Sequence, residues 1–245
     1  MLTPAIVDAA TRRALASGAL QPIETKTSAV EDWGVEFIVR VVSSLARKKV
    51  ARKVDDPLGN YEPDLFVCDV SASHYVLLNK YNALPHHLLI VTRAFEPQEA
   101  ALTEPDFEAL AACMAGFGDV GFYNGGIDAG ASQPRKHLQL VPMAPIPIEP
   151  ALGKLPFRHA FAAIGRLDPA TLHKQYLQML EPGKPYNLLV TRRWMLFVPR
   201  ARECFESLTV NALGFAGSLF ARTEEQARRI REVGPMNVLR HVASA

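Results

Sequence analysis

Apolar residues recur at every second position from 35 to 41, and this period predicts a strand with one buried face. Turn-forming residues separate the next apolar runs, which are rich in β-branched and aliphatic side chains, so we expect an antiparallel meander there. These runs lie at residues 65–70, 75–79 and 87–92. The same reasoning predicts further strands at 118–123 and 136–142, and a hairpin from 187–190 and 194–198.

Helical patterns occupy other parts of the chain. Residues 4–17 follow Thr3, a favourable N-cap, and end at Gly18, which predicts the first helix. Further helices are predicted at 105–114, at 169–180 and as a pair after Thr223. Strands and helices are grouped more than they alternate, which favours an α+β fold with an antiparallel sheet flanked by helices over a doubly wound parallel sheet.

Three long loops divide the chain. A charged loop is predicted at 46–63, a glycine-rich loop at 124–134 and a proline-rich crossing at 142–156. The crossing separates an N-terminal half of about 1–145 from an extended C-terminal half of about 155–245. A chain of 245 residues can bury a substantial core, and we expect both halves to form one domain.

The charge balance limits the classes of partner. The 27 basic and 25 acidic residues leave a net charge of +2, whereas proteins that coat nucleic acid contact many phosphates at once. We therefore expect no nucleic-acid partner, and a small anionic ligand stays open. No stretch is apolar enough to span a bilayer, and the three scattered cysteines suit neither a disulfide framework nor a zinc site, which predicts a soluble, cytoplasmic protein without a membrane partner.

The candidate chemistry lies between residues 123 and 142. In a strand, side chains repeat every second residue, so Arg135, His137 and Gln139 share one face. The glycine-rich loop before them lets backbone N–H groups approach a phosphate, and neutral imidazole is a competent nucleophile near neutral pH. A single histidine on a strand is more often a packed structural residue, but the loop and the polar neighbours make the two interpretations of His137 equally good.

The chain resembles a known family over residues from about 35 to 222. The segments that carry the resemblance are LLNKYN at 77–82, HHLLIVT at 86–92, GASQPRKHLQ at 130–139, YNLLVT at 186–191, WMLFVP at 194–199 and NALGFAG at 211–217. They resemble, in the same order, segments of the diadenosine tetraphosphate phosphorylases, also called ATP adenylyltransferases, of the histidine triad superfamily. The resemblance implies a histidine-triad-like antiparallel sheet.

The resemblance also implies roles for individual residues. His137 matches the family's nucleophilic histidine, and Gln139 matches the glutamine that contacts the transferred phosphate. The other matching positions are Asn79 and Lys80 at the nucleoside end, a substrate-binding Asn124, the phosphate-side loop Gly130, Ala131, Ser132 and Gln133, and a segment of the second half with Asn211, Ala212, Leu213, Ser218 and Arg222. Lys48 is the best match for a phosphate-binding lysine of the family, with Lys49 and Lys53 as alternatives.

Two features of the sequence need separate expectations. Arg135 stands where the family has the first histidine of its motif, and a guanidinium can hold a phosphate with two donors, so we expect Arg135 to bind polyphosphate unless it turns to solvent. His86 and His87 are adjacent, so in a strand they point to opposite faces and cannot share one metal. We expect a structural role for both.

The implied reaction is phosphorolysis. His137 would attack the α-phosphorus of diadenosine tetraphosphate, ATP would leave, and inorganic phosphate would take the adenylyl group to give ADP. Mg²⁺ is expected to accompany the nucleotides, including AMP, without a tightly bound cofactor, and a monomer is favoured. A histidine triad hydrolase is an alternative, although such hydrolases carry histidine where Gln139 stands. The second alternative is a nucleotide-binding regulator with impaired catalysis.

Overall fold

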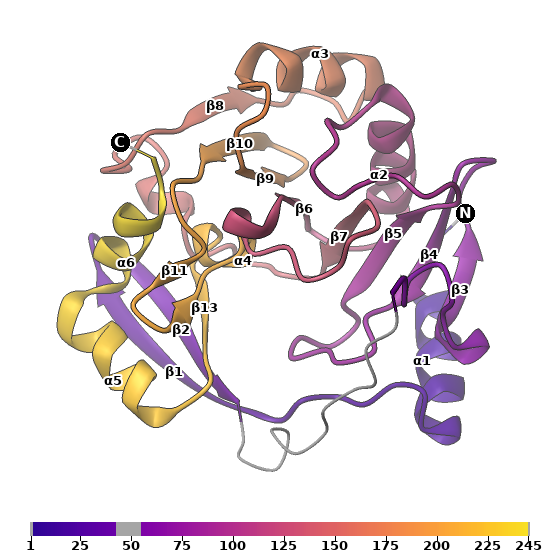
Figure 1. The fold of residues 1–245 in the computed structure, drawn as a ribbon, viewed down its shortest axis with the longest axis horizontal. Helices are drawn as coiled ribbons and strands as arrows, with labels where there is room; N and C mark the ends of the chain where they lie inside the picture. The colour runs from indigo at the N-terminus through magenta and orange to yellow at the C-terminus, as the bar shows by residue number, and fades with distance from the viewer. Residues whose placement is uncertain (1, 43–54, 245) are drawn as a thin grey trace.

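The computed structural model describes residues 2–42 and 55–244. An eight-stranded sheet forms its centre (Figure 1). Its strands are β3 (Phe66–Asp69), β4 (His74–Leu78), β5 (Leu88–Thr92), β6 (Val120–Gly125), β7 (His137–Val141), β8 (Ala160–Ala163), β9 (Tyr186–Val190) and β10 (Trp194–Pro199). They lie in the order β3-β4-β5-β7-β6-β9-β10-β8, and every neighbouring pair is antiparallel. The predicted α+β fold with a large antiparallel sheet is confirmed.

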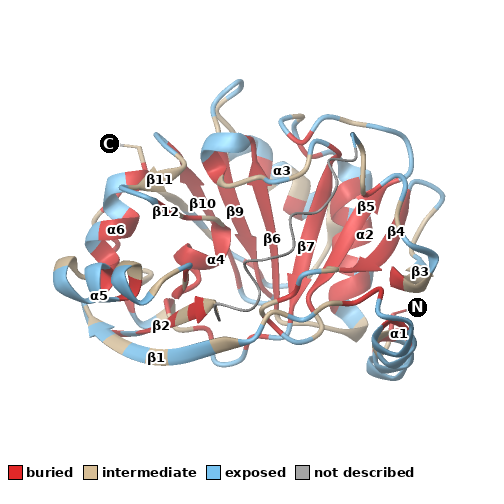
Figure 2. Cartoon of the chain, turned by 60° about the horizontal axis from the view of Figure 1, so that its bottom comes forward, coloured by how far each residue is buried: buried red, intermediate tan, exposed pale blue. Residues whose placement is uncertain are grey.

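Three helices pack on one face of this sheet, namely α1 (Pro4–Ser17), α2 (Glu104–Gly116) and α3 (Pro169–Met179). The core between them and the strands includes Leu138 and Leu140 of β7 and Phe107 of α2. The first helix begins and ends as predicted, because the Thr3 side chain accepts a hydrogen bond from the backbone N–H of Ile6 and Gly18 adopts a φ of 77°. In Figure 2 the strands that α2 covers are buried along most of their length.

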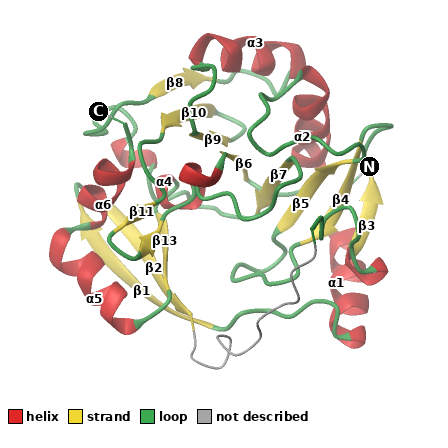
Figure 3. Ribbon diagram, in the orientation of Figure 1, coloured by secondary structure: helices red, strands yellow, loops and turns green. Residues whose placement is uncertain are grey.

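A second, three-stranded sheet lies apart from the main one (Figure 3). It consists of β1 (Thr25–Asp32), β2 (Val35–Val42) and β13 (Ser218–Ala221), and β2 pairs antiparallel with β1 and parallel with β13. Its core face packs against α5 (Glu224–Val233) and α6 (Pro235–Val242). Nearby lie the single turn α4 (Ala212–Phe215) and a small hairpin of β11 (Cys204–Phe205) and β12 (Leu208–Thr209).

Sequence patterns miss β1, β8 and β13, as well as the short hairpin of β11 and β12. Strand β1 lies at the edge of its sheet and exposes much of both faces, so its residues show no apolar alternation. Strand β8 is also an edge strand, and alanine, which is uncommon in strands, fills three of its four positions. Strand β13 has only four residues and depends on its pairing with β2. No helix in the described part of the chain is long and apolar enough to cross a membrane.

Candidate functional site

The face of the main sheet opposite the three helices carries a cavity of about 780 Å³. His137 and Gln139 of β7 line it, while Leu138 and Leu140 point into the core beneath the helices. The apolar residues on the cavity side divide into two clusters, one that includes Phe122 and one that includes Leu89. Both of these residues are neighbours of Gln139 across the sheet, so the polar face of β7 lies where the two clusters meet.

The imidazole of His137 has a defined orientation. Its Nδ1 lies 2.8 Å from the backbone carbonyl oxygen of Arg135, so Nδ1 carries the proton and donates it, and Nε2 keeps the lone pair. The backbone N–H of His137 donates to Oε1 of Gln98 at 2.9 Å. Burial lowers the pKa of His137, and the hydrogen bond to Arg135 opposes this shift. The ring is therefore neutral near pH 7, as a nucleophile must be.

A chain of hydrogen bonds orients Gln139. Nε2 of His87 lies 2.8 Å from Oε1 of Gln139, and Nδ2 of Asn79 lies 3.2 Å from Nδ1 of His87. The amide oxygen of Gln139 accepts, so His87 donates from Nε2 and accepts at Nδ1. Burial lowers the pKa of His87 to about 4, which keeps the ring neutral. The NH₂ group of Gln139 is left to donate to a ligand beside His137.

Sequence reasoning assigned His87 only a structural role. The structure places it within the polar chain of the site, although His86 does turn away toward Thr11 and Asp8 of α1. The signal that could have identified His87 is the strand register, because Leu89 lies opposite Gln139 and His87 is two residues before Leu89. That register depends on β5 pairing with β7, which the local pattern does not reveal.

The glycine-rich loop contributes fewer free donors than expected. The N–H of Gly130 donates to Ile127 at 2.8 Å, and the N–H of Ala131 donates to Gly126 at 3.1 Å, so both serve the loop itself. Ser132 and Gln133 line the cavity, and their N–H groups have no hydrogen-bond partner within the described residues. Ser132 and Gln133 are therefore the residues of this loop whose N–H groups are available to a ligand in the cavity.

Arg135 does not have the expected free guanidinium. Its Nε lies 3.0 Å from both carboxylate oxygens of Asp56, and its Nη2 lies 2.6 Å from Oδ2. Its Nη1 donates to the carbonyl oxygens of Thr92 and Arg93, each at 2.9 Å. The side chain is 9% exposed. The alternative that Arg135 meets only solvent is wrong, because protein groups bind its Nε, Nη1 and Nη2 atoms. This geometry gives the expected polyphosphate clamp no support, and that expectation stays a prediction.

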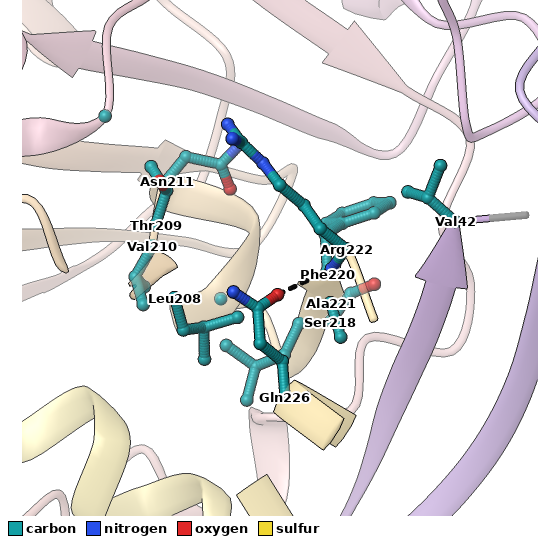
Figure 4. A pocket seen from close by; sticks show the side chains of 13 residues that line it. Val42, Leu208, Thr209, Val210, Asn211, Ser218, Phe220, Ala221, Arg222 and Gln226 are labelled. Atoms are coloured by element: carbon teal, nitrogen blue, oxygen red, sulfur yellow. Dashed lines mark hydrogen bonds between the residues drawn. The ribbon is translucent and has the colours of Figure 1, made fainter. Parts of the chain in front are cut away.

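A second cavity of about 200 Å³ is lined by three of the five residues predicted from the second half. Its lining includes Gly130, Asn211, Ser218 and Arg222, and in Figure 4 the Arg222 side chain extends toward Asn211. A Cβ atom on Gly130 would lie 2.8 Å from the Val210 carbonyl oxygen, so the glycine permits this close approach of the two halves.

Asn124, Ala212 and Leu213 line neither cavity and instead take part in hydrogen bonds at the start of α4. Oδ1 of Asn124 accepts from the N–H of Ala212 at 2.9 Å and from Nδ2 of Asn187 at 2.9 Å. Oδ1 of Asn211 accepts from the N–H of Leu213 at 3.1 Å. These bonds fix the start of α4 against β6 and β9.

The lysines were predicted for the phosphate and nucleoside ends. Lys80 lines the larger cavity together with Asn79 and forms an ion pair with Glu62. Lys48, Lys49 and Lys53 lie outside the described residues. Within the described ranges there is no group of three or more His, Cys, Asp or Glu side chains that could hold a metal ion.

Two family models match the chain. The model described as the Ap4A phosphorylase N-terminal domain matches residues 1–163, and the model described as the ATP adenylyltransferase C-terminal domain matches residues 153–245. Ap4A is diadenosine tetraphosphate.

Relatives with curated names come from Saccharomyces cerevisiae. Diadenosine 5',5'''-P1,P4-tetraphosphate phosphorylase 2 is 25% identical over an alignment of 243 residues, which covers 76% of this chain and 75% of that protein. Protein APA1 is 25% identical over 281 residues, which covers 90% and 87%. The structure of yeast Ap4A phosphorylase Apa2 in complex with Ap4A has a TM-score of 0.82 to this chain at 24% identity, covering 98% and 96% of the two chains. Apa2 with AMP gives 0.83 at 23% identity.

Proposed function

Because the chain belongs to the Ap4A phosphorylase family and its C-terminal part is an ATP adenylyltransferase domain, it is a nucleotidyltransferase, and we propose that it cleaves Ap4A with inorganic phosphate through an adenylyl group carried on His137. The observation that carries the proposal is the neutral imidazole of His137, whose Nδ1 is bound to a carbonyl and whose ring lines the larger cavity beside Gln139.

In the first step, Nε2 of His137 forms a bond to the α-phosphorus of Ap4A, and the bond from that phosphorus to the bridging oxygen breaks. ATP leaves with the electron pair of this bond. The imidazole becomes cationic, and the hydrogen bond from Nδ1 to the carbonyl oxygen of Arg135 stabilises this charge while it fixes the ring plane.

In the second step, an oxygen of inorganic phosphate attacks the same phosphorus, and the bond to Nε2 breaks. ADP leaves, and His137 returns to its neutral form. The reaction is reversible because each step exchanges one phosphorus bond for another. The NH₂ group of Gln139 and the N–H groups of Ser132 and Gln133 would donate to the nonbridging oxygens in both steps, where negative charge develops.

The larger cavity is lined by both polar and apolar side chains. His137, Gln139 and Ser132 are among the polar ones, and Leu58 and Leu77 are among the apolar ones. A nucleotide has the same division, since its base is flat and largely apolar and its phosphates are anionic. We propose that the nucleoside lies against the apolar part, that Mg²⁺ enters with the polyphosphate through its oxygens, and that the protein acts as a monomer on free nucleotides, without a nucleic-acid partner.

A hydrolase is the second candidate, and Gln139 argues against it. Activation of water requires a group that can take up and return a proton, and an amide cannot do so near neutral pH. Product analysis with and without phosphate separates the two reactions. We expect ATP and ADP to accumulate beyond one equivalent of the enzyme only when phosphate is present, because without phosphate each molecule releases ATP once and stays adenylylated. AMP formed without phosphate at a comparable rate would establish hydrolysis.

The test of the covalent step uses a pair of histidine variants. His137→Ala should abolish transfer of radiolabel from Ap4A to the protein and lower phosphorolysis by roughly 10⁴-fold or more, because the nucleophile is lost. His159→Ala is the matched control, since Nδ1 of His159 also lies 2.8 Å from the carbonyl oxygen two residues earlier, but His159 does not line the larger cavity. Labelling of His137→Ala at the wild-type level would refute the mechanism.

A further inference from the structure

A short segment of the chain, residues 55–62, forms one wall of the larger cavity, and Asp56 joins this wall to the strand of the nucleophile. The Asp56 carboxylate binds Arg135 with three contacts between 2.6 and 3.0 Å. The two side chains are 20% and 9% exposed. Because the pair is largely shielded and bidentate, it is more rigid than an exposed ion pair between flexible side chains.

The wall takes its shape from the same carboxylate. Oδ1 of Asp56 accepts from the N–H of Gly59 at 3.0 Å, and the Asp56 carbonyl accepts from the N–H of Asn60 at 3.0 Å. A Cβ atom on Gly59 would lie 2.5 Å from Nη2 of Arg135, so only glycine allows the turn to close over the ion pair. The Tyr75 hydroxyl donates to the Leu58 carbonyl at 2.8 Å and so holds Leu58 of the wall to β4.

On the other side, the ion pair reaches the nucleophile through one residue. The guanidinium of Arg135 is bound by Asp56 and by the carbonyl oxygens of Thr92 and Arg93, so the side chain cannot rotate. The backbone carbonyl of the same residue accepts the hydrogen bond from Nδ1 of His137. Whatever fixes Arg135 therefore also fixes the acceptor that orients the imidazole.

We propose that Asp56 and Arg135 are positioning residues for adenylyl transfer, which couple the wall of the nucleotide cavity to the orientation of His137. The inference rests on the proposed function. In this arrangement the arginine replaces the first histidine of the family motif without touching substrate. A displaced imidazole would still lie beside bound nucleotide but would attack more slowly, because small misplacements of reacting groups cost up to roughly 10²-fold in rate.

The test measures single-turnover adenylylation of the protein over a range of Ap4A concentrations, which separates the rate at saturation from the half-saturating concentration. Asp56→Asn keeps the shape of the side chain but removes its charge, and Arg135→Lys keeps the charge but removes the planar contacts. We expect each to lower the saturating rate by roughly tenfold to a hundredfold, with a smaller change in half-saturation. The double variant should be little slower than either single variant, because both substitutions disrupt the same Asp56–Arg135 ion pair.

Asp69→Asn is the matched control, since Asp69 forms an exposed ion pair with Arg93, the neighbour whose carbonyl binds Arg135. It should adenylylate at the wild-type rate. A wild-type saturating rate in Asp56→Asn, an effect on half-saturation alone, or an equal loss in Asp69→Asn would overturn the proposal. If Asp56→Asn does not fold, Arg135→Lys decides by the same criteria. Absence of adenylylation in the wild-type protein would instead refute the proposed function.

Discussion

Asp106 forms an ion pair with Lys136, which is fully buried and lies next to the nucleophile in the sequence. We expect Asp106→Asn to lower the free energy of unfolding by several kcal/mol. Lys136 precedes His137 and points to the helix-covered face of β7 with a side chain 1% exposed. Its Nζ lies 3.1 Å from Oδ2 of Asp106 and 2.6 Å from Oε2 of Glu96. Oδ1 of Asp106 lies 2.9 Å from Nε2 of His74. The carboxylate therefore connects β4, β7 and α2.

The magnitude follows from the burial and the contacts. Burial by itself would raise the pKa of Asp106, but hydrogen bonds from His74 and Thr103 and the charge of Lys136 lower it to about 2. A folded-state pKa below the unfolded value gives stability that is present above pH 4 and lost as the pH falls toward 2, here roughly 2 kcal/mol. Removing one partner of a buried ion pair costs more, about 3 to 5 kcal/mol, because Lys136 then loses the buried one of its two carboxylate partners.

Urea unfolding at pH 7 measures this loss as a lower transition midpoint at an unchanged slope. Asp69→Asn, which breaks an exposed pair with Arg93, should cost at most about 1 kcal/mol in the same assay. Between pH 4 and pH 2 the Asp106→Asn protein should lose less stability than the wild type, because position 106 no longer takes up a proton. A loss below about 1 kcal/mol at pH 7 would show that Glu96 alone compensates Lys136 and would refute the reasoning.

Two further predictions concern the cavity. His87→Phe preserves the aromatic contact with Phe122 but removes the hydrogen-bond donor to Gln139. The saturating rate of adenylylation should therefore fall roughly tenfold or more. An unchanged rate would show that Gln139 does not need His87 to orient it. Burial lowers the pKa of His137, so the acidic limb of the adenylylation rate should lie below the ordinary histidine pKa of about 6.5, and a limb centred at or above that value in a pH series would contradict the neutral, buried nucleophile.

Local patterns were sufficient to predict the elements that depend on neighbouring residues. Alternation along β7 correctly placed His137 and Gln139 on one face and Leu138 on the other. The antiparallel meander of β3, β4 and β5 and the helix that Thr3 caps also agree with the structure. Each of these predictions uses a side-chain period or a capping residue, which the chain carries within about ten positions.

The features that local patterns did not reveal are contacts between distant parts of the chain. Arg135 was expected to bind phosphate because its face of the strand was known, but Asp56, which occupies its guanidinium, lies 79 residues earlier. His87 was assigned a structural role because nothing in the neighbouring sequence indicates its contact with Gln139, which lies 52 residues later. Strand order and register determine the contact of His87, and the position of the segment 55–62 determines that of Arg135. A local period encodes neither.

Arg135 and Lys136, the two basic residues before the nucleophile, hold the start of β7 in position. Arg135 is bound by Asp56 on the cavity side, and Lys136 is bound by Asp106 on the opposite side. Each charge is held from a different element, so rotation or sliding of the chain just before His137 would separate at least one ion pair. A charge left without its partner in a buried site is far more costly than one in solvent. The imidazole can thus be held by its neighbours, while its own Nε2 and the NH₂ group of Gln139 stay available for a nucleotide.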